Sequence, residues 1–285
     1  MLSYRHGFHA GNFADVHKHA ALVLLLQALN RKENPYCYIE THAGAGFYDL
    51  RGEFASTKRE YEDGIGRLWQ RDDLPVTVAS YLQAVRAANA SRGMPGHVLR
   101  FYPGSPWIAR QYLRSQDRMV LMELHGSETP ELAHQFERTR RAQIEERDGY
   151  AGLKAHVPPI ERRGLVLIDP AYERRNEFDL ARAALADGWQ RWSSGIFALW
   201  YPILTRPPIE QFHRTIAKSG IQKVLVSELV VRSTTVSNRL NGSGLIVVNP
   251  PWKFDESLRE TLTGLAPVLQ QDDAVATRVD WLVPE

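Results

Sequence analysis

Cysteine is almost missing from this chain, because Cys37 is the single one among 285 residues. A disulfide framework is therefore excluded, and a reducing, cytoplasmic setting is expected. Long apolar runs are missing as well: the longest extends from Ala20 to Leu26, whereas ~20 residues are needed to span a bilayer. The first residues lack the pattern of a signal peptide, and there are no repeats or low-complexity tracts. We therefore expect a globular protein with no membrane partner.

The chain also lacks a strong charge of either sign. Its formal net charge is +2, with 24% charged residues. Contact with a nucleic acid would therefore depend on local cationic patches rather than on the field of the whole molecule. With 44% hydrophobic residues, the length suits one large domain, or one domain that carries an insertion.

Short apolar runs rich in β-branched residues alternate with polar stretches of helix length. Because the runs are apolar on both faces, they predict strands of a sheet that helices cover on both sides. This alternation is typical of an α/β doubly wound sheet, which binds ligands beyond the carboxyl ends of its strands. The runs are Tyr36–Glu40, Met119–Leu124, Leu165–Asp169, Gly195–Tyr201, Lys223–Leu229 and Leu245–Asn249, with a weaker strand at Ala142–Glu146 and an edge strand at Thr277–Val283.

Between about Gly52 and Gly96 the alternation is interrupted. Thr57–Gln70 and Pro75–Ala90 are predicted to be two amphipathic helices with no strand between them. We therefore expect a small helical insertion subdomain at residues 52–96, within a main domain formed by residues 1–51 and 97–285.

A glycine turn follows the first predicted strand, in the sequence Glu40-Thr-His-Ala-Gly-Ala-Gly46. Gly44 and Gly46 allow a tight turn and a close approach of the backbone to a ligand. An ordinary turn between a strand and a helix explains the same glycines. A site for NAD is disfavoured, because its fingerprint needs a third glycine that opens a helix.

Polar residues follow the next two strands. Glu123 can accept both ribose hydroxyls of an adenosyl ligand, and Asp148-Gly149 can place a side chain and a backbone N–H at an adenine edge. Taken singly, Glu123 is equally explained as a solvated acid, and Asp148-Gly149 as a plain turn. Together with the glycine turn they occur in the order of an S-adenosylmethionine site.

The most apolar strand, Gly164–Ile168, is followed by Asp169-Pro170-Ala171-Tyr172. The Asp169 carboxylate and the Pro170 carbonyl can accept hydrogen bonds from an exocyclic amino group. The ring of Tyr172 can stack on the base that carries this group. The tetrapeptide is therefore a candidate site for a base with an amino group.

The segment from His9 to His19 leads into an apolar helix, for which Asp15 is the expected N-cap. Lys18 and His19 would then lie in the first turns, where a cation can bind the carboxylate of a methionine moiety. His17 and His19 are two residues apart, so they face different sides of a helix and cannot bind one metal ion together. No metal is expected.

Several longer blocks resemble one family. They are Leu2-Ser-Tyr-Arg-His6, His9-Ala-Gly-Asn12, Lys18-His19, Thr41-His-Ala-Gly-Ala-Gly46, Tyr102-Pro-Gly-Ser-Pro106, Arg162-Arg-Gly-Leu165, Leu199-Trp-Tyr-Pro202 and Asn249-Pro-Pro-Trp252. Over its whole length the chain resembles the bacterial 23S ribosomal RNA adenine-N6-methyltransferases of the RlmJ type. The resemblance implies a class I methyltransferase fold, which is Rossmann-like with a mostly parallel seven-stranded sheet and a helical insertion. It implies S-adenosylmethionine as methyl donor, S-adenosylhomocysteine as product and one adenine of 23S ribosomal RNA as target. A monomer is expected.

The resemblance also implies roles for single residues. Carried over by motif, cofactor contacts fall on Lys18, His19, His42, Ser105, Glu123, Asp148 and Gly149, and the catalytic carboxylate falls on Asp169, near the cofactor. Tyr4 and His6 match positions tied to the RNA base, although such a tail is usually frayed. Local cationic patches are expected to hold the RNA: Lys58-Arg59, Arg138–Arg141, Arg162-Arg163 and Arg174-Arg175. Arg174 and Arg175 are favoured because they follow the catalytic loop directly.

The chain departs from the family motif at one position, where Ala171 replaces the second proline of Asp-Pro-Pro-Tyr. Proline fixes φ and would stiffen this loop, so we expect a modest loss of rate and not a dead enzyme. Asn249-Pro-Pro-Trp252 keeps both prolines but follows the sixth apolar run. Methyltransferases with this order of motifs carry the signature on the fourth strand, so Asp169 is favoured over Asn249.

Three other functions are compared with this one. A DNA adenine-N6 methyltransferase shares the chemistry, but the chain has no long target-recognition domain. An RNA-binding ribosome-assembly factor that has lost catalysis through Ala171 would bind cofactor or RNA without turnover. An NAD-dependent enzyme is disfavoured by the missing third glycine.

Overall fold

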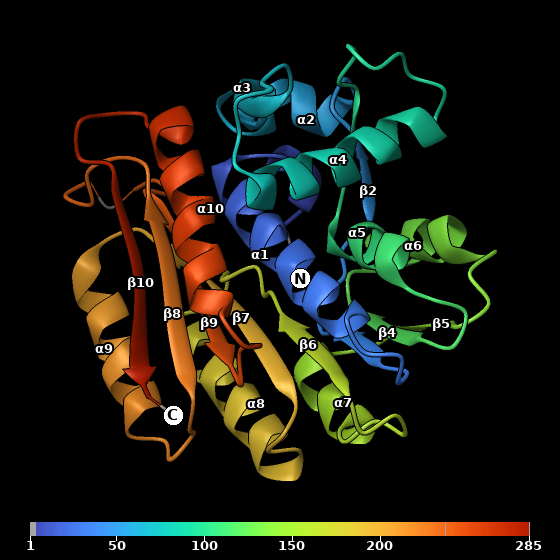
Figure 1. The fold of residues 1–285 in the computed structure, drawn as a ribbon, viewed down its shortest axis with the longest axis vertical. Coiled ribbons are helices and arrows are strands. Elements are labelled where there is room, and N and C mark those ends of the chain that lie inside the picture. The colour runs from blue at the N-terminus through green and yellow to red at the C-terminus, as the bar shows by residue number, and fades with distance from the viewer. Residues whose placement is uncertain (1–3, 237, 285) are drawn as a thin grey trace.

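The computed structural model describes residues 4–236 and 238–284, and one eight-stranded sheet runs through them (Figure 1). The strand order is β10-β8-β9-β7-β6-β1-β4-β5. The strands are β1 Cys37–Glu40, β4 Arg118–Glu123, β5 Ala142–Glu146, β6 Gly164–Ile168, β7 Ile196–Ile203, β8 Val224–Val230, β9 Gly242–Val248 and β10 Ala276–Val283. All eight apolar runs predicted from the sequence form strands. The implied count of seven was wrong, because β10 adds an eighth strand at the edge beside β8.

The strand directions decide where a ligand can bind. β5, β4, β1, β6 and β7 are parallel, whereas β9 is antiparallel to both of its neighbours, β7 and β8. The carboxyl ends of the five parallel strands therefore meet at one edge of the sheet. In open α/β sheets the ligand site lies at this edge, near the point where the strand order reverses.

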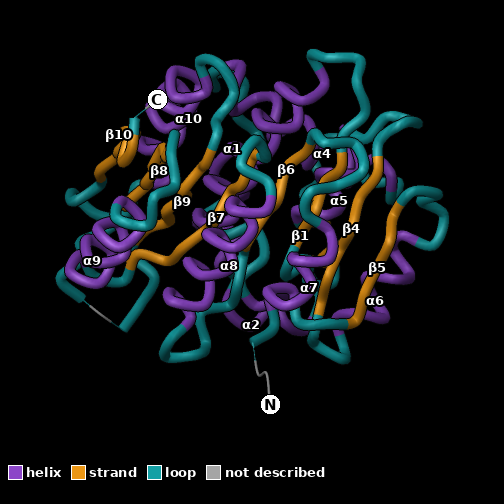
Figure 2. Tube along the Cα trace, turned by 90° about the horizontal axis from the view of Figure 1, so that it is seen from below, coloured by secondary structure: helices purple, strands orange, loops and turns teal. Residues whose placement is uncertain are grey.

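Helices cover both faces of the sheet (Figure 2). Alternate residues of the strands point to opposite faces, so Tyr38 and Leu121 join one apolar cluster while Ile39 and Val120 join the other. The first face carries α1 Phe13–Asn30, α4 Val76–Ser91, α5 Ser105–Tyr112, α6 Glu128–Phe136 and α10 Phe254–Leu269; the second carries α7 Gly149–His156, α8 Glu177–Arg191 and α9 Arg206–Ala217. No helix in the described part of the chain is long and apolar enough to cross a membrane.

The predicted insertion is helical but is divided differently from the prediction. Its elements are α2 Glu53–Lys58, the 3-10 helix η2 Glu60–Asp63, α3 Ile65–Leu68 and α4; the short strands β2 Phe47–Asp49 and β3 Phe101–Pro103 pair on either side of it. The prediction of one helix over Thr57–Gln70 was wrong, because Arg59 has a left-handed φ of 52° and Gly64 leaves the helical region. The second helix is confirmed as α4. Its apolar side packs in the same cluster as α1.

Candidate active site

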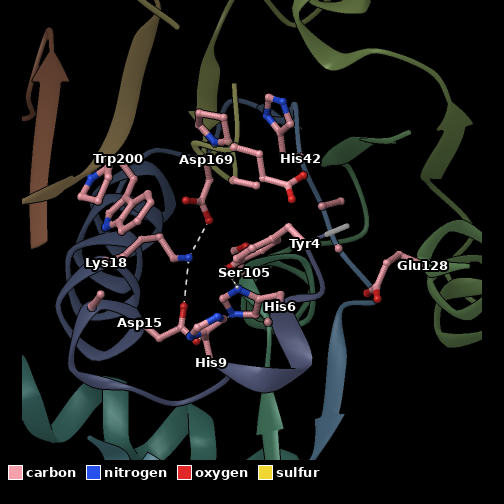
Figure 3. A pocket seen from close by; sticks show the side chains of 18 of the residues that line it. Tyr4, His6, His9, Asp15, Lys18, His42, Ser105, Glu128, Asp169 and Trp200 are labelled. Atoms are coloured by element: carbon pink, nitrogen blue, oxygen red, sulfur yellow. Dashed lines mark hydrogen bonds and ion pairs between the residues drawn. The ribbon is translucent and has the colours of Figure 1, made fainter. Parts of the chain in front are cut away.

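A cavity of about 500 Å³ opens at the carboxyl edge of the parallel strands (Figure 3). It brings together residues that are far apart in the sequence. The residues singled out from the sequence that line the cavity include Tyr4, His6, Asp15, Lys18, His19, His42, Gly44, Lys58, Ser105, Glu123, Asp148, Gly149, Asp169, Pro170, Ala171 and Arg174. Gly46, Tyr172 and Arg175 do not line it.

The turn after β1 and the acid at the end of β4 form one wall. Glu123 accepts hydrogen bonds from the backbone N–H groups of Gly44 and His125, both at 2.7 Å. Gly44 and Gly46 have φ values of 58° and 76°, which favour glycine. Gly46 does not line the cavity, but its carbonyl stabilises the turn by accepting a hydrogen bond from the N–H of Gly104 at 2.9 Å. The predicted glycine turn after β1 and Glu123 at the end of β4 are therefore in contact.

Gly149 explains how α7 reaches this wall. A Cβ atom at this position would lie 1.9 Å from the carbonyl oxygen of Thr41, so only glycine lets the helix start so close to the β1 turn. Asp148 caps the helix by accepting from the N–H of Ala151 at 3.1 Å. His42 lies between these elements, and burial lowers its pKa to about 4. It is therefore a neutral imidazole at pH 7.

Glu40 is a buried acid beneath the cavity, and no role for it is predicted from the sequence. Its side chain accepts hydrogen bonds from Tyr38 Oη at 2.7 Å and from the Ser105 hydroxyl. Burial raises the pKa of Glu40 to about 8, against the lowering effect of the two hydroxyls. In the sequence, only its position at the end of the first predicted strand indicates that Glu40 lies near the site. Ser105 itself lines the cavity at the start of α5.

The first helix starts differently from the prediction. The N-cap is Asn12, whose Oδ1 accepts from the N–H groups of Ala14 and Asp15, both at 3.0 Å. Asp15 is not the cap, and this expectation was wrong. Asp15 instead lies in the first turn with its side chain 2% exposed. Because Asn12 caps the helix, the Asp15 carboxylate can bind side chains in the cavity.

Lys18 is the central cation of the cavity (Figure 3). Its Nζ lies 2.5 Å from Asp169 Oδ2 and 3.0 Å from Asp15 Oδ1. Burial alone would lower the pKa of Lys18, but the two carboxylates outweigh it and raise the pKa. For Asp15, burial opposes ionisation, yet His6, Lys18 and His19 hold its pKa well below the usual range. The group is therefore a lysine ammonium between two carboxylates.

The N-terminal residues fold over this charged group. Tyr4 Oη lies 2.9 Å from His6 Nδ1, and His6 Nε2 lies 2.8 Å from Asp15 Oδ2. The ring of Tyr4 also stacks on His9, with centroids 5.6 Å apart and planes 5° from parallel. Tyr4 and His6 are thus part of the cavity wall. Their contact with the RNA base, which the resemblance implies, stays a prediction.

His19 lies next to Lys18 on α1, and its Nε2 is 3.9 Å from the same Asp15 Oδ1 that Lys18 contacts. Its Nδ1 lies 2.8 Å from Tyr102 Oη, while its buried Nε2 has no hydrogen-bond partner among the described residues. Burial lowers its pKa well below the ordinary value. His17 lies between Ser227 and Ser243, 2.9 Å from each hydroxyl. The two histidines therefore have separate surroundings.

The loop after β6 places Asp169, Pro170 and Ala171 on the cavity, but turns Tyr172 away from it. Tyr172 has a left-handed φ of 54°, and its hydroxyl donates to the carbonyl of Trp200 at 2.7 Å. In this structure its ring packs on Phe178 rather than over the cavity.

Three further residues of the cavity have no role predicted from the sequence. Trp200 and Pro202 reach it from β7, and Arg239 from the connection between β8 and β9. The signal for the first two was the block Leu199-Trp-Tyr-Pro202, which comes at the carboxyl end of a parallel strand. No motif near Arg239 in the sequence indicates that it reaches the cavity.

The cavity has the features that a bound S-adenosylmethionine requires. Gly44 and Gly149 let the backbone come close, Glu123 supplies a carboxylate, and the buried Nε2 of His19 has no hydrogen-bond partner within the described part of the chain. No group of three or more metal-ligating side chains occurs among residues 4–236 and 238–284.

The sheet is mostly parallel, with the antiparallel strand β9 inserted between β7 and β8 and the antiparallel strand β10 at the edge. Together with the cavity beyond β1 and β4, this arrangement defines a class I S-adenosylmethionine-dependent methyltransferase. The model of the family described as ribosomal RNA large subunit methyltransferase D, RlmJ, matches residues 33–283. The chain belongs to this family.

Relatives agree over the full length. The chain is 44% identical to the ribosomal RNA large subunit methyltransferase J of Escherichia coli strain K12 and 41% identical to that of Haemophilus influenzae, with all of each chain covered. It also resembles a crystal structure of a protein from Legionella pneumophila, with 34% identity and a TM-score of 0.87 over 96% of this chain and 98% of that one.

Proposed function

We propose that this methyltransferase transfers a methyl group from S-adenosylmethionine to the exocyclic N6 of one adenine in 23S ribosomal RNA. The observation that carries the proposal is the position of Asp169 and Pro170, which follow β6 and face the cavity beside the β1 turn. A carboxylate and a carbonyl together match the two hydrogens of an amino group. The ribosomal target rests on the family and on the names of the relatives.

The proposed cofactor residues surround one half of the cavity. Glu123 would accept the ribose hydroxyls, and Asp148 and Gly149 would meet the adenine edge. Lys18 would attract the carboxylate of the methionine moiety. His19, His42, Gly44 and Ser105 would complete this half, with Gly46 holding the turn. The bound cofactor supplies an electrophilic methyl group on a sulfonium.

The protein groups act on the amine and its proton. The N6 lone pair of adenine is delocalised into the ring, so hydrogen bonds to Asp169 and the Pro170 carbonyl would favour a more tetrahedral and more nucleophilic nitrogen. Positioning should supply much of the acceleration. Once N6 carries the methyl group it is cationic and acidic, and Asp169 can take its proton.

The base must leave its stack to reach Asp169, so the target adenosine is flipped out or lies in a loop. Tyr4 and Trp200 face the cavity and can contact the base. Stacking by Tyr172 stays a prediction, which requires its hydroxyl to leave the Trp200 carbonyl.

The RNA backbone would meet cations at the mouth of the cavity. Arg174 lines the cavity and is exposed, with its Nη2 3.8 Å from Asp148 Oδ2, and Arg175 follows it on the surface. Lys58, from the insertion, and Arg239 are exposed at other points of the lining. We propose that these four side chains bind phosphates.

We propose a monomer as the working form. Bacterial ribosomal RNA is modified in the cytoplasm, which supports that location for the enzyme.

The test is methyl transfer from labelled S-adenosylmethionine to unmodified 23S ribosomal RNA, followed by nucleoside analysis. We expect N6-methyladenosine from the wild type and a rate reduced by about 10²- to 10⁴-fold in Asp169→Ala. Trp252→Ala is the matched control, because Trp252 ends the similar motif after β9, is 81% exposed and lies off the cavity. It should keep full activity.

Other outcomes would contradict the proposal. Methylation of DNA but not of RNA would show a DNA methyltransferase. Binding of cofactor and RNA without any product would favour the assembly factor that has lost catalysis through Ala171.

A further inference from the structure

The Asp15 carboxylate contacts three groups of the protein, which are the N–H of Gly11, His6 and Lys18. One oxygen, Oδ2, accepts from the backbone N–H of Gly11 at 2.9 Å and from His6 Nε2 at 2.8 Å. The other oxygen, Oδ1, lies 3.0 Å from Lys18 Nζ. Both carboxylate oxygens are therefore occupied by groups of the protein.

The first link concerns Lys18 and Asp169. In this structure the Lys18 ammonium lies against Asp169 Oδ2, on the carboxylate that has to bind the adenine amino group. If Lys18 left Asp169 without another acid at hand, a buried ammonium would lose its counter-charge, which is strongly unfavourable. Asp15 already holds the same ammonium from the other side. Lys18 can therefore loosen its bond to Asp169 while its charge stays paired.

The second link concerns the residues that cover the base. A carboxylate only accepts hydrogen bonds, so His6 Nε2 carries the hydrogen that Asp15 accepts. When the ring is neutral, its Nδ1 is then an acceptor for the hydroxyl of Tyr4. Asp15 thereby sets both the orientation and the tautomer of His6, and through it the position of Tyr4.

We propose that Asp15 is a positioning residue that couples the two halves of the site: it takes over the Lys18 ammonium when Asp169 binds the adenine amino group, and it holds His6 and Tyr4 against the base. The inference rests on the proposed methyltransferase reaction. It assigns Asp15 no contact with substrate, and its effect passes through Lys18 and His6.

The test compares Asp15→Asn with the wild type on unmodified 23S ribosomal RNA. Asparagine keeps the size and can still accept from Gly11, but it removes the charge that balances Lys18. We expect kcat to fall by about 10- to 100-fold, because Lys18 then stays on Asp169. The dissociation constant for S-adenosylhomocysteine, measured by calorimetry, should change by less than kcat does, because Glu123, Asp148 and Gly149 lie apart from Asp15 and keep their contacts.

A double-mutant cycle separates positioning from general damage. In the Lys18→Met background, Asp15→Asn should lower kcat much less than in the wild type, since the two residues act as one unit. Glu228→Gln is the matched control: Glu228 is as buried as Asp15 and binds Arg206 Nη1 at 2.6 Å, but it lies off the cavity. It should lower the melting temperature without a change in kcat.

Two results would overturn the inference. One is an Asp15→Asn enzyme with wild-type kcat. The other is an equal loss in both backgrounds, which would mean that Asp15 acts independently of Lys18. Should the wild type itself make no N6-methyladenosine, the proposed function fails and the inference with it.

Discussion

At the scale of single residues, the loop after β6 contains the proposed catalytic acid, Asp169, and the departure from the family motif, Ala171. Asp169 and Pro170 face the cavity, and Ala171 lines it beside them. The next residue, Tyr172, is held in a left-handed conformation. Alanine at position 171 leaves the backbone of this loop freer than proline would.

Replacing Ala171 by proline should therefore raise kcat. We expect an increase of about two- to fivefold, which corresponds to the ~0.4–1 kcal/mol by which a compatible proline restricts a flexible chain. Steady-state methylation of 23S ribosomal RNA measures it, with Ala171→Gly as the opposite change, which should lower kcat. Equal rates for alanine and proline would show that the stiffness of this loop does not limit the reaction.

Glu40 makes the stability of the protein depend on pH. Its pKa is raised from 4.5 to about 8, mainly by burial, so the folded protein keeps a proton that the unfolded chain releases above about pH 4.5. The unfolded state then binds fewer protons than the folded state, and the free energy of unfolding falls as the pH rises from about 5 to about 8. The slope from this one group is at most ~1.4 kcal/mol per pH unit.

Glu40→Gln should remove this dependence, because glutamine does not ionise. Urea unfolding at several pH values gives the free energy of unfolding for both proteins. The curve of the variant should be flatter between pH 5 and pH 8. Parallel curves would mean that Glu40 is ionised in the folded protein.

At the scale of elements, the N-terminal block and the insertion fit together through a glycine contact. A Cβ atom on Gly64 would lie 2.1 Å from the carbonyl oxygen of Gly11 and 2.7 Å from the Cα of Asn12. The N–H of Ile65 donates to the same carbonyl at 2.9 Å. The insertion therefore packs directly on the residue that caps α1.

Gly64→Ala should push these elements apart. We expect a loss of about 1–3 kcal/mol in the free energy of unfolding, as for other overpacked sites. A lower kcat should accompany it, because the shifted cap moves Asp15 and Lys18. Gly96→Ala, in the same insertion but with nothing within 4 Å of the added atom, is the control and should leave both quantities unchanged. An equal loss in both variants would show that the close approach of Gly64 to Gly11 is not the cause.

At the scale of the whole molecule, the helical insertion shares its core with the main domain. Val78, Tyr81 and Val85 of α4 are fully buried in the cluster that also contains Leu22 and Leu25 of α1. The division into residues 52–96 and the remainder stays a prediction about the sequence. Whether residues 52–96 are an independent unit of stability depends on whether they unfold together with the rest of the chain.

We expect one unfolding transition in urea, because removing α4 from α1 exposes the core of the main domain. Far-ultraviolet circular dichroism and hydrogen exchange of α4 and α8 should give the same midpoint. Earlier exchange in α4 than in α8 would show that residues 52–96 open as a separate unit.

Much of the fold was predictable because its signals are local. Apolar runs and their spacing identified all eight strands of the large sheet, and the polar residues after β1, β4, β5 and β6 marked the edge where the cavity opens. The single long helix over Thr57–Gln70 was wrong because a periodic pattern does not reveal that Gly64 must pack on the backbone of Gly11.

The sequence by itself determined the class of fold, the family and the order of the site motifs along the chain, since these depend on neighbouring residues. Only the tertiary structure decided which side chains of the site contact one another. Lys18 meets Asp169 across 151 residues, and the cap at Asn12 releases Asp15 to bind Lys18. The pKa of Glu40 depends on burial beneath the cavity. Such contacts form only when the sheet assembles, because the packing of distant segments sets their distances and their dielectric surroundings.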